Sequence, residues 1–316
     1  MERRDFLKVC SAATVAAMAS QLGLKSEPHT EVVYEDLDTS PVELNSAIEY
    51  MASVPPNSNE YLKSFQLRKP RAESSQSNLQ NYMAKMKSFE QTHVEDIFLD
   101  TDQYQVLLST FRRLDRVQSL VGHGNFNVIS FDEMIRYSQR YGSVGQFKAA
   151  ELAFLEEIFF SDAQRYGFFG EKVISKLTAV VPRNARYKVP YTGHFVYRGD
   201  SLSSYTRVKK DVGNSIILTS GIRSVVKQTH LFLAKAVQSR GNLSRASRSL
   251  APPGHSFHGV GDYDVGKIGF GRRNFTSDFA NTGEFKKLVE LGYINMRYPE
   301  DNLLGVRYEP WHIKVV

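Results

Sequence analysis

The sequence predicts an α+β fold in which a mostly helical part is followed by a part that mixes strands with helices. Two observations support this prediction. Apolar residues recur at helical spacing through the first half of the chain, whereas runs rich in β-branched and aromatic residues begin only after Tyr187. These later runs do not alternate regularly with helices, so they do not predict the parallel sheet of an α/β fold.

The composition is that of a globular protein large enough for two domains. The chain has 316 residues, of which 41% are hydrophobic and 23% are charged, as is ordinary for soluble proteins. The formal net charge is +6, but the basic residues form no block that would indicate a nucleic-acid partner. Cys10 is the only cysteine. It precedes the predicted mature chain, so disulfides and thiolate metal sites are excluded there.

The N-terminal segment MERRDFLKVCSAATVAAMA, residues 1–19, predicts an exported protein. The stretch RRDFLK resembles the twin-arginine export signal, and the weakly apolar run that follows is too short to span a bilayer. The stretch AMA at its end has the small residues that a signal peptidase reads. We therefore expect a twin-arginine signal peptide at 1–19 and a polar linker at 20–45. The mature protein is then periplasmic or otherwise exported, without stable membrane insertion.

Helical periodicity predicts a helical domain of unknown role at residues 46–185. The clearest segments are Asn78–Phe89, Gln103–Leu120 and Gln146–Phe160. In the last of these, apolar residues at helical spacing form one face and two glutamates lie opposite. This amphipathic pattern is typical of a helix that packs on a core.

Residues 186–316 are expected to form a second domain of mixed structure. Strands are predicted at 194–199, 215–221, 267–270 and 305–316, and helices at Val225–Ser239 and Thr282–Leu291. Thr282 suits an N-cap and Gly292 a C-cap of the last helix. Pro310 predicts an irregularity in the final strand.

The side chains with the strongest chemical potential lie in two short stretches of this second domain. The stretch APPGHSFHGVGDYDVGK contains His258, Asp262 and Asp264, and the C-terminal stretch YEPWHIKVV contains Glu309 and His312. Two imidazoles and a carboxylate are a common ligand set for catalytic zinc, which leaves one position open for water. A further carboxylate beside that water can act as a general base.

Three motifs in these and a nearby stretch resemble the VanY-like D-alanyl-D-alanine carboxypeptidases. SFHGVGDYD looks like the family's Ser-x-His-x-x-Gly-x-x-x-Asp, EPWH at 309–312 looks like its Glu-x-Trp-His, and SGIRS at 220–224 looks like its Ser-Gly-x-Arg-Ser. The family belongs to the LAS zinc peptidases, which share a fold with the hedgehog N-terminal domain. The resemblance covers the last third of the chain and implies a small antiparallel sheet there.

The resemblance implies zinc as the cofactor, with His258, Asp264 and His312 as its ligands. One feature departs from the family: its motif places the aspartate one residue further from the histidine than Asp264 lies from His258. Asp264 followed by Val265 is similar to the family's Asp-Ile, which favours Asp264. Asp262 remains the alternative ligand.

The same resemblance assigns the remaining site residues. Glu309 would be the general base that takes a proton from the zinc-bound water. Arg223 would hold the terminal carboxylate of the substrate or polarise the scissile carbonyl. Gln228 and Ser256 would contact the substrate.

The implied function is a zinc-dependent peptidase that acts on the peptide stems of peptidoglycan. Removal of a terminal D-alanine is favoured, and an L,D-endopeptidase or a dipeptidase would use the same metal set. A catalytically degenerate module that binds wall peptides is the alternative of a different class. The shortened His–Asp spacing favours the module, whereas the presence of Glu309 favours the enzyme, because a binding module needs no general base.

Overall fold

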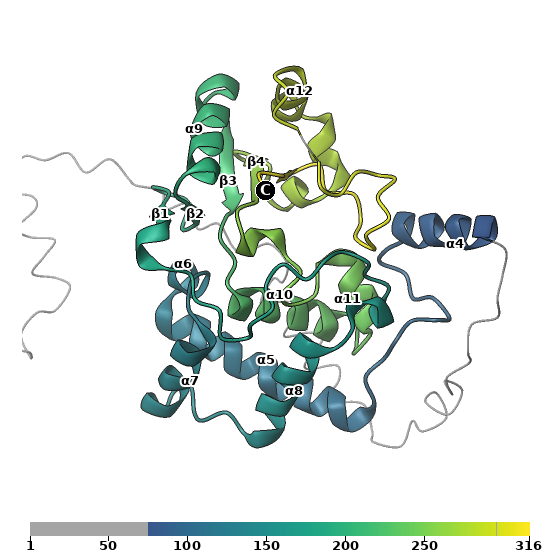
Figure 1. Ribbon diagram of the computed structural model, residues 1–316, viewed down its shortest axis with the longest axis vertical. Coiled ribbons are helices and arrows are strands. Elements are labelled where there is room, and N and C mark those ends of the chain that lie inside the picture. The colour runs from purple at the N-terminus through teal and green to yellow at the C-terminus, as the bar shows by residue number, and fades with distance from the viewer. Residues whose placement is uncertain (1–74, 295) are drawn as a thin grey trace, which may run out of the picture. The chain divides into compact units, whose positions relative to one another are not determined.

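The computed structural model of the protein describes residues 75–294 and 296–316. It confirms the α+β class, with helices and two small antiparallel sheets (Figure 1). The predicted signal peptide, the linker and the first part of the predicted helical domain lie outside the described residues. Within the described part of the chain, no helix combines the length and the apolar character needed to cross a membrane.

The predicted helices of the first part are confirmed in place and type, with small shifts at their ends. The elements are α4 (Ser75–Lys87), α5 (Thr101–Val121), α6 (His123–Phe126), α7 (Phe131–Arg140) and α8 (Ala149–Phe160), followed by the 3₁₀ helices η1 (Ala163–Tyr166) and η2 (Arg183–Ala185). Capping boxes begin α5, with Asp100 and Gln103, and α7, with Ser130 and Glu133. These caps explain why each helix begins where it does.

The second part contains α9 (Asp200–Val212), α10 (Val225–Gln238), α11 (Leu243–Ser249) and α12 (Gly283–Glu290), with 3₁₀ helices η3 (Phe257–Gly259), η4 (Gly271–Phe275) and η5 (Ser277–Asn281). The N-cap prediction for α12 is confirmed, because the side chain of Thr282 accepts a hydrogen bond from the Phe285 amide. At the other end Leu291 is the C-cap, and Gly292 follows it with a positive φ of 71°.

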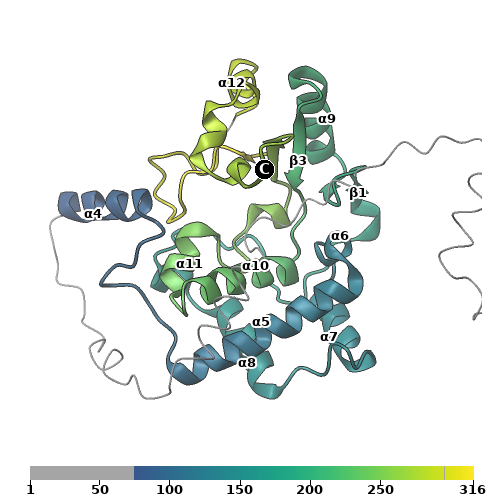
Figure 2. The same cartoon turned by 180° about the vertical axis from the view of Figure 1, so that it is seen from behind.

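Two antiparallel sheets complete the fold. In the smaller one, β1 (Arg186–Lys188) pairs with β2 (Phe195–Tyr197). In the larger one, β4 (Tyr263–Lys267) lies between β3 (Ile216–Ser220) and β5 (His312–Ile313). Figures 1 and 2 show α9 and α12 close to this larger sheet.

Two strand predictions were wrong. The strand expected at 267–270 is absent: β4 occupies Tyr263–Lys267, and the chain then turns at Gly269, which has a φ of 77°. The strand expected at 305–316 is reduced to β5. Pro310 and Trp311 form a turn before it, in which the His312 amide donates to the Glu309 carbonyl at 3.2 Å.

The larger hydrophobic core is built from helices of both halves of the chain. It joins residues of α5, α7 and α8 to residues of α10 and α11, including Leu107, Phe111, Phe154, Phe232 and Leu233. A buried ion pair between Arg113 and Glu151, with N–O distances of 2.7 and 3.2 Å, ties α5 to α8. The core therefore draws on both sides of the predicted boundary at residue 186, and the division into two domains stays a prediction.

A second core lies against the three-stranded sheet. Its members include Val208, Leu218, Tyr263, Val265 and Trp311, and every position of β3 is buried. A strand with both faces covered has no solvent-facing alternation, which explains the continuous apolar run at the start of β3. This packing fixes the position of the sheet, whose strands β4 and β5 carry candidate site residues.

A buried arginine attaches the loop after α4 to α11. The guanidinium of Arg248 lies 2.6 Å from Oδ1 and 2.9 Å from Oδ2 of Asp96, and Asn242 donates to the same carboxylate at 2.7 Å. Arg248 also donates to the carbonyls of Phe89 and Gln91. This network holds residues 89–97 beside α11.

Candidate metal centre and active site

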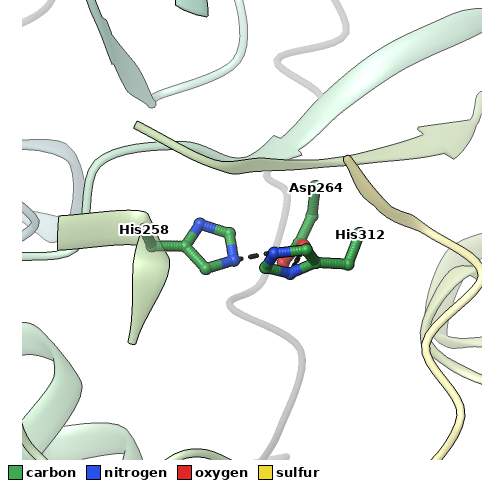
Figure 3. Close-up of side chains that lie close together, drawn as sticks. All are labelled: His258, Asp264 and His312. Carbon is green, nitrogen blue, oxygen red and sulfur yellow. Dashed lines mark ion pairs between the residues drawn. The ribbon is translucent and has the colours of Figure 1, made fainter. Parts of the chain in front are cut away.

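Three segments that are distant in the sequence bring His258, Asp264 and His312 together. Asp264 of β4 pairs in register with His312 of β5 and, on its other side, with Ser220 of β3. His258 comes from η3, just before β4. Their side chains point toward one another (Figure 3), and one ligand atom from each lies within 4.8 Å of the others. All three residues are buried.

Hydrogen bonding assigns the tautomer of His258. Its Nδ1 lies 2.8 Å from the carbonyl oxygen of Gly221, which can only accept, so Nδ1 carries the proton. Nε2 therefore presents a lone pair, and it lies 3.2 Å from Oδ1 of Asp264. Among the described residues, neither of these two buried atoms has a hydrogen-bond partner. Two lone pairs that face each other at this distance call for a cation between them.

His312 is oriented in the same way by Asp262. Its Nε2 donates to Oδ2 of Asp262 at 2.9 Å, so Nδ1 faces Oδ1 of Asp264 at 3.2 Å. Burial alone would lower the pKa of His312, but its hydrogen bond to Asp262 and the nearby carboxylate of Asp264 raise that pKa to about 9. A metal ion at Nδ1 would replace this proton.

The donor set and its geometry fit zinc. Zinc takes imidazole nitrogen and carboxylate oxygen at about 2.0–2.2 Å, so neighbouring ligands of a tetrahedral site lie about 3.3 Å apart. The two distances from Asp264 Oδ1 to the histidine nitrogens are both 3.2 Å. Burial, followed by the charge of Arg223, lowers the pKa of His258 to about 4, so this imidazole is neutral and able to bind a metal.

Asp262 lies outside the three-residue cluster and binds the outer nitrogen of His312. Its Oδ2 accepts from Arg297 Nε at 2.6 Å as well as from His312, and its Oδ1 accepts from the backbone amides of Val315 and Val316. It is thus engaged with the outer nitrogen of a ligand histidine and with the C-terminal backbone. The carboxylate that shares the cluster with both histidines is that of Asp264.

Glu309 lies beside the ligands without joining them. Its Oε2 is 3.8 Å from Nδ1 of His312, and the turn at Pro310 and Trp311 aims both side chains at the same space. Burial raises the pKa of Glu309 to about 7, although the nearby charges of His312 and Arg307 oppose that rise. A carboxylate with this placement suits a general base.

Arg223 approaches the centre from the segment after β3. Its Nη2 lies 2.6 Å from Oδ2 of Asp264, and its Nε donates to Oγ of Ser220 at 2.8 Å. Gly221 is required at this turn, because a Cβ there would lie 2.0 Å from the carbonyl oxygen of Phe195. Ser224 then caps α10 by accepting from the Lys227 amide. Four of the five residues of the SGIRS segment, all but Ile222, therefore have a structural role in these contacts.

Residues 200–316 match the model of the VanY family, D-alanyl-D-alanine carboxypeptidase. The matched region contains every site residue described above. This match supports a peptidase. No curated protein matches the chain.

Three solved structures are similar to part of this chain. The LdcB LD-carboxypeptidase is 22% identical over 41% of this chain and 63% of its own, with a TM-score of 0.34. VanYB in complex with D-Ala-D-Ala is 23% identical over 42% and 76%, with a TM-score of 0.32. A vancomycin-resistance D,D-pentapeptidase VanY mutant in complex with Zn(II) is 20% identical over 48% and 88%, with a TM-score of 0.33. This chain thus covers less than two thirds of LdcB.

The two residues predicted to contact substrate, Gln228 and Ser256, are both buried. Gln228 is buried in α10, where Nε2 donates to the carbonyl of Ala251 at 2.6 Å, and its Oε1 has no hydrogen-bond partner among the described residues. Ser256 is buried at the start of η3, two positions before His258. Their contact with substrate stays a prediction.

A small cavity of about 40 Å³ adjoins the candidate metal centre. Its walls include Arg223, Asp264 and Glu309, together with Lys227 and Arg307. Sequence reasoning missed Lys227, Arg307 and the supporting Arg297. The position of Arg307 two residues before Glu309 is the one sequence signal that could have drawn attention to it.

Proposed function

We propose that this protein is a zinc-dependent peptidase that acts on the peptide stems of peptidoglycan and removes a terminal D-alanine. One observation carries the proposal: buried lone pairs of His258, Asp264 and His312 converge, and those of His258 and Asp264 have no other partner among the described residues. Burying such atoms unpaired costs free energy, which a bound cation would recover. The match to the VanY family supports the peptidase class.

Glu309 supplies the proton chemistry in this proposal. Bound zinc would lower the pKa of a water ligand and polarise the scissile carbonyl. Glu309 accepts a proton as water adds to that carbonyl, and then donates it to the amine of the departing D-alanine. The products are free D-alanine and a peptide shortened by one residue. Glu309 ends the cycle ionised, as it began.

Arg223 is the proposed electrophilic partner. Its Nη2 is held against Asp264 and its Nε against Ser220, so its guanidinium is kept beside the metal ligands. A fixed cation there stabilises the negative charge that develops on the carbonyl oxygen. Arginine suits this role because its planar guanidinium stays charged at every physiological pH.

The alternative of a binding module without catalysis is disfavoured by Glu309. Its side chain is buried within 3.8 Å of a ligand histidine. Burying an ionisable carboxyl group costs free energy, and a protein without catalysis would gain nothing from it. An L,D-endopeptidase or a dipeptidase would share all of these features. Those two activities are therefore distinguished by their products.

The decisive experiment combines metal analysis with product analysis. The purified mature protein should contain one zinc per chain, and it should release D-alanine from a synthetic stem peptide that ends in D-alanyl-D-alanine. Mass spectrometry of the products identifies the bond that is cleaved. A zinc-loaded protein that binds the peptide and leaves it intact would identify the binding module instead.

We also propose export by the twin-arginine route, on the basis of the sequence at 3–8 alone. Replacing Arg3 and Arg4 by lysine should leave unprocessed precursor in the cytoplasm. Normal export of that double variant would contradict this part of the proposal.

A further inference from the structure

We infer that Arg307 binds the terminal carboxylate of the substrate and thereby makes this site favour a peptide with a free C-terminus. This inference rests on the proposed function. It assigns to Arg307 a recognition role that is separate from the proposed roles of Arg223 and Glu309.

Arg307 is held rigidly at the wall of the cavity beside the metal centre. Its guanidinium carbon lies 4.8 Å from the ring centroid of Phe89 and 5.0 Å from that of Trp311, so the group makes cation–π contacts with both rings. Its backbone amide donates to the carbonyl of Arg248 at 2.9 Å. Arg248 also donates a hydrogen bond to the Phe89 carbonyl. Arg307 and Phe89 are therefore both attached to the same buried arginine.

The guanidinium of Arg307 retains an unused donor. Its Nε is buried and has no hydrogen-bond partner among the described residues. The nearest carboxylate, that of Glu309, is 4.0 Å away, which is too far for a hydrogen bond. A buried charged donor left in this way is unfavourable, and an incoming carboxylate would satisfy it with two parallel hydrogen bonds.

The charge around the cavity favours an anion. Arg223, Lys227 and Arg307 line it together with the carboxylates of Asp264 and Glu309. Asp264 is already paired with Arg223 at 2.6 Å. Zinc would add two further positive charges at the same place, so the binding of an anionic group is favoured electrostatically.

The size and position of the cavity suit the end of a peptide. Its volume of about 40 Å³ is roughly three times the 10–15 Å³ that one water needs, which is room for a small polar group. In an extended chain, neighbouring residues are separated by about 3.3–3.6 Å. A carboxylate on Arg307 would therefore bring the preceding peptide bond beside Glu309, 4.0 Å from Arg307 Nε.

The test compares two peptides that differ only at their C-terminus. Both end in D-alanyl-D-alanine, one as the free acid and the other as the amide, so the scissile bond is the same. Zinc-loaded full-chain protein is assayed as wild type, Arg307→Gln, Arg307→Lys and Arg273→Gln. Arg273 is the matched control, because it is an exposed arginine that pairs with Asp278 on the surface. Zinc content and thermal unfolding are measured for each protein.

We expect the wild type to prefer the free acid. Arg307→Gln should lower kcat/KM for the acid about 10- to 100-fold, the effect of losing a hydrogen bond to a charged group. For the amide the loss should be smaller, about 2- to 10-fold, because an uncharged terminal group makes a weaker hydrogen bond with the guanidinium than a carboxylate does. Arg307→Lys keeps the charge and loses the planar fork, so it should lie between the two. The control should match wild type on both peptides.

Equal losses on the acid and the amide in Arg307→Gln would show a structural role and overturn the inference. If that variant does not fold, the lysine variant decides: an unchanged acid-to-amide ratio in a folded, zinc-loaded Arg307→Lys overturns it as well. A wild type that cleaves both peptides equally removes this inference alone. A wild type that cleaves neither removes the proposed function and this inference with it.

Discussion

Oδ2 of Asp262 lies 2.9 Å from Nε2 of His312, on the side of the imidazole that faces away from Asp264. This contact leaves Nδ1, the other nitrogen of His312, facing His258 and Asp264, where it can bind a metal ion that displaces its proton. Carboxylate–histidine pairs of this kind orient metal ligands and raise their basicity. Asp262 therefore orients a ligand histidine. By sequence, four positions after His258, it had been the alternative metal ligand.

Asp262→Asn should weaken zinc binding without abolishing it. The amide removes the negative charge behind His312, and loss of such an outer partner typically costs about 10- to 100-fold in metal affinity. Competition with a zinc-binding dye measures the change. Asp278→Asn is the control, since Asp278 forms an exposed pair with Arg273. Unchanged affinity in Asp262→Asn would show that the contact has no influence on the metal.

Removing a ligand should have a larger effect on zinc than removing Asp262. His258→Ala and Asp264→Ala each delete one of three converging donors, so both should lose stoichiometric zinc. Zinc at 1,000 times its Kd should stabilise the wild type by about 4 kcal/mol, and a ligand variant should show no such shift in Tm. His123→Ala, an exposed histidine on α6, is the control. An empty site in Asp262→Ala with a full site in Asp264→Ala would exchange the roles of the two aspartates.

Glu309→Gln should separate catalysis from metal binding. The amide has nearly the same shape, so the protein should fold, bind zinc and bind peptide. It cannot accept a proton, and general acid–base assistance is worth about 10²- to 10⁴-fold, so kcat should fall by that factor. Zinc content and steady-state kinetics on a peptide that ends in D-alanyl-D-alanine provide the measurement. Loss of zinc in this variant would instead identify Glu309 as a ligand, and full activity would remove it from the mechanism.

Asp96→Asn should destabilise the fold at neutral pH. It leaves Arg248 buried beside an uncharged partner, and breaking a buried ion pair typically costs about 3–5 kcal/mol. Burial alone would raise the pKa of Asp96, but its hydrogen bonds with Arg248 and Asn242 hold that pKa below its usual range. The contribution of the ionised carboxylate is therefore complete at neutral pH and is lost as the pH falls through the lowered pKa of the folded state.

Urea unfolding at pH 7 and at steps below pH 4 measures this dependence. The difference between wild type and Asp96→Asn should be largest at pH 7 and should shrink toward the acid end. Glu95→Gln is the neighbouring control, because Glu95 pairs with Lys85 on the surface, where such pairs contribute about 0–1 kcal/mol. A difference between wild type and Asp96→Asn that is independent of pH would contradict the assigned charge state.

Local patterns were sufficient to predict the fold class and the long elements. The helical repeat in 103–120 predicted α5 closely, and Thr282 as an N-cap predicted the start of α12, because both signals act within a few residues. The strands were less predictable. Strand β5 is short because the Pro310 turn allows pairing with β4 only at His312 and Ile313, and such pairing depends on a partner elsewhere in the chain.

The sequence by itself determined which side chains were available for chemistry: two histidines, three carboxylates and the arginine of SGIRS, in motifs whose order could be read directly. The resemblance favoured Asp264 as the ligand, but Asp262 stayed an alternative, since both lie within a few residues of His258. The tertiary structure decided that Asp264 faces both imidazoles while Asp262 lies behind one of them. It also decided that Arg307 lines the cavity. The physical reason is strand register: pairing of β4 with β5 sets Asp264 opposite His312, and register depends on contacts between segments far apart in the chain.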